Sequence, residues 1–483
     1  MKVLLLNSPW VQTKTQYGVK AGSRWANIRN LKQNIMHYPF PFTLAYACSF
    51  LKSKGYEAVV KDAIAEGLSL DETMEYATQF RPDVVVLETC TPSIDTDLQF
   101  AEGLKQAFSP TIILSGNHAT SVPKQMLQYK AVDFVVLGNE FEFVLLELFE
   151  HFDDYEGVKG IAFRKNGDVR VNERRELIKD LDTLPYPERD SLPLHKYNDP
   201  FCKDYPNLPM ISSRGCPFTC IFCLEPYVFY DRPSLRTRSA KNVVDEMVYL
   251  GEKYKVKEPY FDDASFTNSM KSARDISQEI LRRGLNVQWS CMGDPRADYE
   301  TLKVMKEAGC VGLKFGVESA DPQIRKTIQK PTTLEQVKNF VNSCNRLGLY
   351  SHGTYMLGLP GETKESMYRT IDFAFSLNST TRQFSIATPL PGTKYYEMAE
   401  KNDWLLTKDW SKYEGAGSSI VKTPGLTTEE ILAAMKTVKK RRIVHTFKRP
   451  RIGFNYLRKT YKMRGLLGTL EEVFQKTWFL LAG

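Results

Sequence analysis

Residues 214–223 read Arg214-Gly-Cys-Pro-Phe-Thr-Cys-Ile-Phe-Cys223, which places Cys216, Cys220 and Cys223 on one short loop. Three thiolates at this spacing can hold one metal centre and leave one of its ligand positions open. A structural zinc ion takes four Cys or His ligands, and no second Cys-x-x-Cys pair lies nearby to complete such a site. The loop therefore favours an iron–sulfur centre with an open iron over a zinc site or unrelated thiols.

The chain around this loop has 483 residues, enough for two or three domains with ample cores. Its composition, 42% hydrophobic and 25% charged, is ordinary for a globular protein. The apolar start at Met1 is short and reads as a first strand rather than a signal peptide, and no apolar run is long enough for a membrane span. The other six cysteines are scattered singly, which indicates a reducing cytoplasm.

Residues 1–150 alternate short apolar runs with helical stretches, which predicts a doubly wound parallel sheet. Strands are expected at 3–7, 58–62, 83–88, 111–116 and 133–138, with helices such as 44–54 and 99–108 between them. In such a sheet, ligands bind beyond the carboxyl ends of the strands. The residues predicted there are Asp62, Gly67, Thr89, Thr91, Gly116, Asn117, His118, Gly138 and Glu140.

Residues 206–405 resume the alternation, and the cysteine loop follows the first strand, which includes Met210. Further strands are expected at 259–261, 288–291, 312–316, 352–356 and 383–387, which gives six βα units and a partial barrel. Because barrel chemistry lies at the carboxyl ends of the strands, the loops there are candidate ligand contacts. They supply Asp262 and Asp263, then Glu318 and Ser319, then Gly358, and finally the loop 389–393.

The cysteine loop resembles the cluster loop of the radical SAM superfamily, Cys-x-x-x-Cys-x-aromatic-Cys, with Phe222 as the aromatic residue. The resemblance implies a (βα)6 barrel and a 4Fe-4S cluster held by Cys216, Cys220 and Cys223. It also implies that the open iron binds S-adenosylmethionine and cleaves it to a 5'-deoxyadenosyl radical. By the same resemblance, Asp262 and Asp263 would bind the ammonium, Glu318 or Ser319 the ribose, and the Gly358 loop the adenine.

The loops of residues 1–150 resemble those of the cobalamin-binding domain that often precedes this barrel. The family loop is Asp-x-His-x-x-Gly; Asp62 and Gly67 match it, but Ile64 stands at the His position, where an alkyl chain cannot ligate cobalt. Two interpretations remain: cobalamin held without a ligand from the protein, or a domain that has lost the cofactor. His118 is either a contact to the cofactor's tail or a simple loop histidine.

Two stretches carry less chemistry. Residues 151–205 read as a connector that contains a hairpin turning at Asn166-Gly167 and a proline-rich linker. The stretch from Ala21 to Trp25 reads either as a surface loop or as a substrate or cofactor contact.

Residues 406–483 are predicted to be a helical, basic tail. Thr427 and Glu430 form a capping box for a helix running to about Arg442. From Lys436 to Arg464 there are twelve Lys or Arg and no Asp or Glu, so this segment accounts for more than the whole net charge of +8. Aromatic residues interleave with these charges, which suits an anionic membrane surface or nucleic acid phosphates, while a helical cap over the barrel is the third interpretation.

These features predict a cobalamin-dependent radical SAM enzyme that methylates an unactivated carbon of a hydrophobic small molecule, with cobalamin as the methyl donor. One alternative is cyclisation or rearrangement in lipid or tetrapyrrole biosynthesis, and the other is a metal-stabilised membrane-binding module without turnover. We expect flavodoxin or ferredoxin as electron donor and no nucleic acid partner. The expected location is the cytoplasm, with peripheral contact to the inner face of the membrane.

Overall fold

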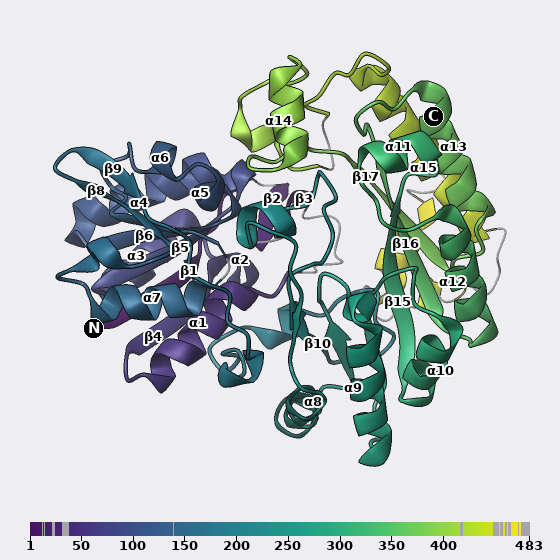
Figure 1. The fold of residues 1–483 in the computed structure, drawn as a ribbon, viewed down its shortest axis with the longest axis horizontal. Helices are drawn as coiled ribbons and strands as arrows, with labels where there is room; N and C mark the ends of the chain where they lie inside the picture. Colours follow the sequence, from purple (N-terminus) through teal and green to yellow (C-terminus); the bar gives the residue numbers. More distant parts are fainter. Residues whose placement is uncertain are drawn as a thin grey trace.

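The computed structural model describes residues 1–447 except 12, 14, 22–24, 31–37, 139 and 416–418, and beyond them 454, 457, 458, 461, 465–471, 473 and 474. Two large sheets stand side by side, one in each half of the chain (Figure 1). The first has seven strands and the second has six. The α/β architecture expected from the alternating pattern is confirmed.

The first sheet has the order β4-β1-β5-β6-β7-β8-β9. Its parallel strands are β1 (Lys2–Asn7), β4 (Glu57–Asp62), β5 (Val84–Thr89), β6 (Thr111–Gly116) and β7 (Phe134–Val136). Alternate side chains of β1 enter two different cores: Val3 and Leu5 pack with α1 (Phe42–Ser53) and α7 (Phe141–Glu150), whereas Leu4 and Leu6 pack on the opposite face. That face is covered by α3 (Leu70–Phe80) and α4 (Ile94–Phe108). Helices on both faces explain why β5 is buried along its whole length and why its first four residues are all apolar.

The hairpin predicted in the connector forms and extends this sheet. β8 (Ile161–Lys165) pairs antiparallel with β7, and β9 (Asp168–Val171) closes the edge. Asn166 and Gly167 both have positive φ, 51° and 89°, as a two-residue turn matching the strand twist requires. The connector of the sequence analysis therefore contributes two strands to the first sheet.

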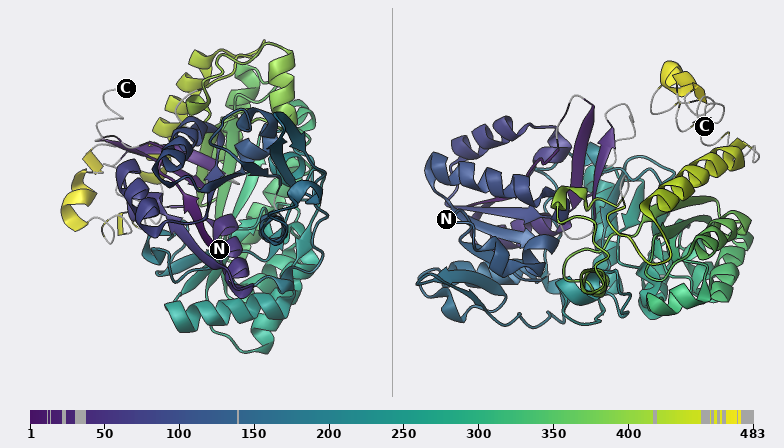
Figure 2. Two further views of the ribbon diagram at one scale, coloured as in Figure 1. Left: turned by 90° about the vertical axis from the view of Figure 1, so that its left-hand side faces the viewer. Right: turned by 90° about the horizontal axis from the view of Figure 1, so that it is seen from above.

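A second hairpin was not predicted. β2 (Gln16–Ala21) and β3 (Trp25–Asn30) pair antiparallel in a sheet of their own, within the stretch read as a loop around Ala21 to Trp25. Residues 22–24 of that stretch lie outside the described residues. The hairpin stands between the two lobes (Figures 1 and 2).

The second sheet is the partial (βα)6 barrel. Its parallel strands, in order, are β10 (Asn207–Met210), β13 (Glu258–Phe261), β14 (Trp289–Gly293), β15 (Cys310–Glu318), β16 (Tyr350–Leu357) and β17 (Thr381–Ile386). The helices that follow them are α8 (Ala240–Tyr254), α9 (Met270–Arg282), α10 (Tyr299–Glu307), α12 (Leu334–Arg346) and α13 (Lys364–Ser376). Short elements complete the fold: α2 (Ala63–Glu66), α5 (Asn117–Ser121), α6 (Pro123–Met126), α11 (Pro322–Thr327), β11 (Ser213–Arg214) and β12 (Arg236–Thr237).

The barrel strands show which side chains face the lumen. Along β16 the burial alternates strictly: Tyr355 lies in the buried set and stacks on Phe384 of β17 at 4.9 Å, whereas His352 and Thr354 belong to the partly accessible set. Phe384 in turn stacks on Phe375 of the outer helix α13. Odd positions of β16 therefore form the core under the helices, and even positions line the lumen.

The C-terminal region begins with α14 (Lys394–Lys401) and ends its long described stretch with α15 (Thr428–Phe447). The capping box is confirmed, because Glu430 N–H donates to Thr427 Oγ1 at 3.3 Å and Thr427 N–H donates to Glu430 Oε2 at 3.1 Å. The helix continues beyond the expected end near Arg442. Within the described part of the chain, no helix combines the length and apolarity needed to cross a membrane.

Candidate active site

The cysteine loop leaves β11 and is held by backbone hydrogen bonds from two distant segments. Ile221 N–H donates to Ile328 O at 3.2 Å, and Tyr395 N–H donates to Ile221 O at 2.9 Å. Ser234 N–H donates to Cys216 O at 2.9 Å. The loop therefore has a fixed path at the carboxyl end of the barrel before any metal is considered.

Cys216, Cys220 and Cys223 are partly accessible, whereas the other six cysteines are buried. Burial raises the pKa of the Cys216 thiol to about 11 and also raises those of Cys220 and Cys223, so metal binding would have to displace protons. In the described residues no three His, Cys, Asp or Glu side chains gather as ligands of a single ion would. A cubane cluster suits such a loop better, because each thiolate binds a different iron atom. Phe222, the aromatic residue of the motif, is half-buried and packs on the core cluster containing Ile221.

A lysine that sequence reasoning missed lies beside this loop. Lys330 Nζ is 3.0 Å from Glu318 Oε1, and both side chains are only 12% exposed. The preceding residue, Gln329, offers its carbonyl oxygen to the Cys220 thiol at 3.7 Å. The cation thus sits between the cysteine loop and the end of β15. The sequence did not mark Lys330 as a candidate site residue, because it follows a short helix and the candidates were sought at the ends of strands.

The two carboxylates after β13 have different surroundings. Asp263 is 1% exposed, and its Oδ1 accepts from Ser213 Oγ at 2.5 Å and from Ser212 N–H at 3.0 Å. It therefore anchors the chain that leads into the cysteine loop. Asp262 is only half-buried, and its N–H donates to Met210 O at 2.9 Å. Of the two, Asp262 has the side chain more open to a ligand.

The other predicted barrel residues also differ in how far they are buried and in which groups they contact. Glu318 ends β15 with a φ of 64° and pairs with Lys330, whereas Ser319 is fully buried and its Oγ accepts from Asp321 N–H at 3.1 Å. After β16, Gly358 has a φ of 84°, and its N–H donates to Glu362 Oε2 at 2.6 Å. Glu362 is completely buried, and this burial raises its pKa to about 7.

In the first lobe, the predicted residues do gather at the carboxyl ends of the strands. Asp62 caps α2 through Ala65 N–H and accepts from Tyr197 Oη at 2.8 Å; burial raises its pKa to about 6. Gly67 ends α2 in the left-handed conformation. Thr89 Oγ1 donates to Ser115 O at 2.7 Å. A Cβ on Gly116 would lie 2.1 Å from Thr89 O, so only glycine allows these two strand ends to approach.

The loop after β6 holds buried polar atoms that lack partners. His118 is fully buried, and its Nδ1 lies 3.3 Å from Thr91 Oγ1. Neither His118 Nε2 nor Asn117 Oδ1 has a hydrogen-bond partner among the described residues. Burial lowers the pKa of His118 to about 4, so the ring is neutral at pH 7. Because buried polar groups rarely stay unpaired, this loop suits a polar ligand.

Gly138 and Glu140 lie at the contact between the lobes. A Cβ on Gly138 would approach Phe229 O to 2.7 Å, and Glu140 pairs with Arg236 at 2.7 Å. Phe229 belongs to η5, the π-helical turn Glu225–Phe229 that follows the cysteine loop, and η5 also packs on α5. The cysteine loop is therefore joined through η5 to the carboxyl edge of the first sheet.

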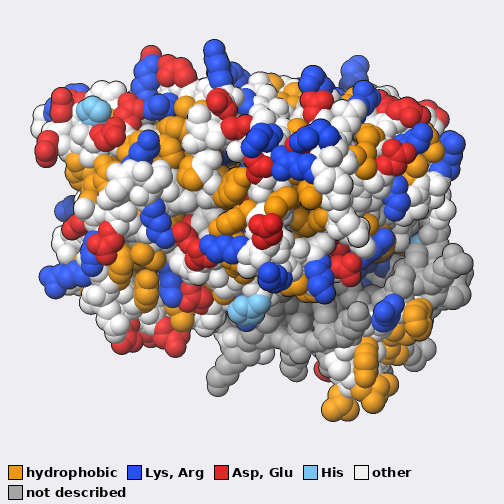
Figure 3. Space-filling view, turned by 90° about the horizontal axis from the view of Figure 1, so that it is seen from below, with side chains coloured by type: hydrophobic (Ala, Val, Ile, Leu, Met, Phe, Trp, Pro, Cys, Tyr) orange, Lys and Arg blue, Asp and Glu red, His pale blue; other side chains and the backbone are white. Residues whose placement is uncertain are grey.

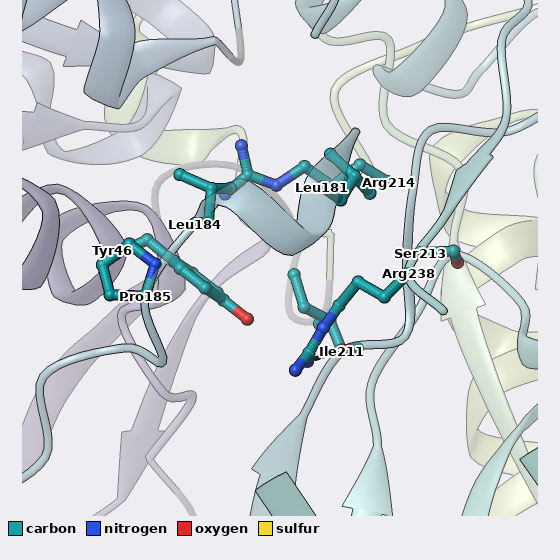
Figure 4. A pocket seen from close by; sticks show the side chains of 8 residues that line it. All are labelled: Tyr46, Leu181, Leu184, Pro185, Ile211, Ser213, Arg214 and Arg238. Atoms are coloured by element: carbon teal, nitrogen blue, oxygen red, sulfur yellow. Dashed lines mark hydrogen bonds between the residues drawn. The ribbon is translucent and has the colours of Figure 1, made fainter. Parts of the chain in front are cut away.

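A small hollow between the lobes is shown in Figure 4. Its volume is about 10 Å³, the space of one water molecule, which is too small for a substrate. Its walls are formed by Tyr46, Leu181, Leu184, Pro185, Ile211, Ser213, Arg214 and Arg238.

Comparison with known proteins identifies both lobes. Residues 210–374 match the radical SAM superfamily, and residues 31–143 match the B12 binding domain. The chain is 34% identical to an uncharacterized methyltransferase of Pyrococcus horikoshii, over 81% of this chain and 85% of that protein. The chain belongs to the cobalamin-binding radical SAM enzymes. The cofactors of this family are a 4Fe-4S cluster, S-adenosylmethionine and cobalamin.

Other relatives of this cobalamin-binding radical SAM enzyme carry out different reactions. It is 26% identical to cytidylyl-2-hydroxyethylphosphonate methyltransferase of Streptomyces wedmorensis, over 82% of this chain and 84% of that protein. It is 28% identical to anaerobic magnesium-protoporphyrin IX monomethyl ester cyclase of Cereibacter sphaeroides, over 81% and 65%. Among solved structures, the methyltransferase TsrM of Kitasatospora setae has a TM-score of 0.69 at 18% identity, covering 91% of this chain and 90% of that one. OxsB has a TM-score of 0.71 at 14% identity, covering 100% and 75%; both structures share the fold.

Proposed function

We propose that this enzyme methylates an unactivated carbon of a small molecule. The observation that carries the proposal is that η5, which directly follows the loop of three partly accessible thiols, packs on α5 at the carboxyl edge of the B12-binding lobe. Radical formation and methyl donation would thus occur at adjoining faces. When bound, the cluster supplies the electron that cleaves S-adenosylmethionine, and cobalamin supplies the methyl group.

The barrel residues would hold the cluster and S-adenosylmethionine. Cys216, Cys220 and Cys223 provide three thiolate ligands and leave one position for the amino acid end of S-adenosylmethionine. The half-buried carboxylate of Asp262 suits the ammonium group, and Lys330 suits the carboxylate. Glu318 is bound to Lys330 in this structure and could exchange that partner for the ribose hydroxyls. The positive φ of Gly358 keeps its loop bare enough for a flat base to approach.

Asp263 and Ser319 belong to this site as supports rather than contacts. Each is buried and engaged with the neighbouring backbone, Asp263 with Ser212 and Ser319 with Asp321. Their place in the proposal is to fix the ends of β10 and β15, from which the contacting side chains project.

The first lobe would hold cobalamin along its carboxyl edge. Thr89 and Gly116 bring two strand ends into close approach, and Asn117 and His118 offer the unpaired buried atoms. Ile64 lies in α2, directly after the strand-end Asp62, so the protein presents an alkyl group where an imidazole ligand is expected. We therefore propose that cobalt receives no nitrogen from this chain.

The proposal is tested by anaerobic reconstitution followed by incubation with cobalamin and methyl-labelled S-adenosylmethionine. Reduced flavodoxin or ferredoxin, the proposed physiological donors, should replace a chemical reductant. The expected results are 5'-deoxyadenosine and transfer of the label to cobalamin. A protein that binds zinc and forms neither product would reject the enzyme assignment.

Cyclisation or rearrangement is the second candidate, because the chain is also similar to an anaerobic cyclase over 81% of its length. The same experiment separates the two reactions. Formation of 5'-deoxyadenosine with no labelled methyl on cobalamin or product would favour the cyclase chemistry.

We also propose that the C-terminal tail contacts an anionic membrane surface, which suits a hydrophobic substrate. Among the described tail residues, Phe454, Leu466, Leu467 and Phe474 are 66%, 63%, 82% and 67% exposed. Figure 3 shows hydrophobic side chains gathered at the lower right of the molecule. The exposed Phe and Leu side chains belong to the same tail as the segment 436–464, which has twelve basic residues. Such a combination of apolar and basic side chains suits a surface of anionic lipid. The notable aromatics Trp478 and Phe479 lie outside the described residues.

The membrane proposal is tested by sedimenting the full chain with phosphatidylcholine vesicles, with and without phosphatidylglycerol. Binding should require the anionic lipid and should fall in a Leu466→Glu/Leu467→Glu variant, whereas Leu281→Glu on the exposed end of α9 should bind normally. The membrane proposal would be overturned if the full chain did not sediment with anionic vesicles, or if it bound RNA and not the vesicles.

A further inference from the structure

The segment from Trp404 to Thr423, here called the strap, links the two lobes. Its ends meet, because Lys422 N–H donates to Trp404 O and Leu406 N–H donates to Ile420 O, both at 2.9 Å. Residues 416–418 within it lie outside the described residues. On the barrel side, Ile386 at the end of β17 donates its N–H to Gly415 O at 3.1 Å. The strap is therefore fixed to the last barrel strand.

The other side of the strap lies on the B12-binding lobe. Its helical turn η7 (Trp410–Lys412) packs against η1 (Thr91–Ser93) and α4. The Trp410 ring meets the His118 ring edge to face, with centroids 5.1 Å apart and planes at 69°. Trp410 also packs on the core that α4 shares with the first sheet. An aromatic side chain from the C-terminal region thus covers the loop after β6.

The covered ring carries one buried atom without a partner, His118 Nε2, and the preceding residue carries another, Asn117 Oδ1. The position combines a flat aromatic surface with hydrogen-bonding groups that nothing else in the described structure satisfies. A ligand group that has both a flat base and polar atoms matches this combination. Cobalamin carries such a group in its nucleotide tail, which joins a benzimidazole base to ribose and phosphate.

We propose that Trp410, on the helical turn η7 of the strap, forms one wall of the binding site for the nucleotide tail of cobalamin. This inference rests on the proposed use of cobalamin and adds a contact from residues that lie outside both family matches, 31–143 and 210–374. Trp410 supplies a surface for the base, and His118 and Asn117 supply polar contacts. Because the strap is anchored on β17, it also connects cofactor retention to the barrel.

The test compares hydroxocobalamin with cobinamide, which lacks the nucleotide tail. Each is titrated into the full chain and followed by its absorbance, with no turnover required. Trp410→Ala should weaken hydroxocobalamin binding by about tenfold or more, the scale of one base-stacking contact, while cobinamide binding stays unchanged. Trp410→Phe should recover part of the loss. Leu281→Ala, on the exposed end of α9 and 43% exposed, is the control outside the strap and should bind both compounds normally.

Several outcomes would overturn the inference. If Trp410→Ala weakens both compounds equally, the strap only holds the lobes together. If it changes neither, Trp410 does not contact the tail. If the unaltered chain binds cobinamide as tightly as hydroxocobalamin, the tail has no site here. Failure of the unaltered chain to bind either compound would instead reject cobalamin use itself, which separates the two levels of the proposal.

Discussion

Arg214, two residues before Cys216, forms a buried bidentate pair with Glu142 of the B12-binding lobe. Its two terminal nitrogens lie 2.5 and 3.1 Å from the two carboxylate oxygens, and the side chains are 8% and 1% exposed. The guanidinium also lies 5.1 Å from the ring of Tyr46 in α1. The start of the cysteine loop is thus tied by charge to the lobe that would hold the second cofactor.

Removing one partner of this pair should destabilise the contact between the lobes. Glu142→Ala leaves the Arg214 cation buried without its carboxylate, so the free energy of unfolding should fall by about 3–5 kcal/mol. Urea unfolding measures this, with Asp275→Ala as control, since the Lys271–Asp275 pair is 86% and 44% exposed. The control should change stability by less than about 1 kcal/mol. Equal losses in the two variants would contradict the interpretation.

Cys216, Cys220 and Cys223 should be the ligands of the iron–sulfur cluster. After anaerobic reconstitution, the chain should contain about four iron atoms, and Cys220→Ala should lose most of them because a thiolate ligand is missing. Cys344→Ala is the matched control, because Cys344 is buried behind the barrel. Iron and sulfide analysis with absorbance spectra measures both variants. A Cys220→Ala protein with full iron content would show that the loop does not hold the cluster.

Lys330 should matter for the binding of S-adenosylmethionine. Lys330→Met removes a charge-assisted contact to the carboxylate and should weaken binding about tenfold or more. The measurement is the change in the electron paramagnetic resonance spectrum of the reduced cluster as S-adenosylmethionine is added. Lys330→Arg should bind more tightly than Lys330→Met, and the exposed Lys326→Met should behave as the unaltered chain. Unchanged titration of Lys330→Met would remove this residue from the site.

Ile64 leads to a spectroscopic expectation. An alkyl side chain cannot donate an electron pair to cobalt, so cob(II)inamide bound to the chain, which has no nucleotide base of its own, should show no splitting from a protein nitrogen. Electron paramagnetic resonance of the loaded chain tests this directly. Appearance of a nitrogen triplet that persists when cobinamide replaces cobalamin would mean that another protein side chain reaches the metal.

Glu362 should make stability depend on pH. Its pKa is raised by burial from 4.5 to about 7, so between these values the native chain holds a proton that the unfolded chain has released. Stability should therefore fall as pH rises through this window, by about 3 kcal/mol in total. Glu362→Gln cannot ionise and should lose this slope.

The comparison of Glu362→Gln with the unaltered chain is necessary because other buried groups also titrate. Burial lowers the pKa of His118 to about 4 and that of His352 to about 3, and both make stability rise with pH below about 6.5. Asp62, with its pKa raised to about 6, acts in the same direction as Glu362. Urea unfolding at pH 5 and pH 8 should show the variant gaining relative stability at pH 8. A constant difference across this range would contradict the expectation.

The sequence alone determined the parallel strands of the two large sheets and the chemistry of the cysteine loop, but it did not predict the hairpin of β2 and β3. Apolar runs joined by helical stretches predicted the strands closely, because burial on both faces demands continuous apolar residues. The turn at Asn166-Gly167 and the capping box at Thr427 were readable because both depend on residues within four positions of each other. The spacing of Cys216, Cys220 and Cys223 is local in the same way, as is the absence of a histidine at Ile64.

The tertiary structure alone decided which distant residues meet. Lys330 reaches Glu318 because a short helix returns the chain to the end of β15, and Arg214 finds Glu142 72 residues away. Trp410 covers His118 only because the strap is fastened to β17. Local periodicity specifies a helix or strand and its buried face, but such pairings are set by how the faces pack. The cysteine loop could therefore be read from ten residues, whereas its partners required the whole fold.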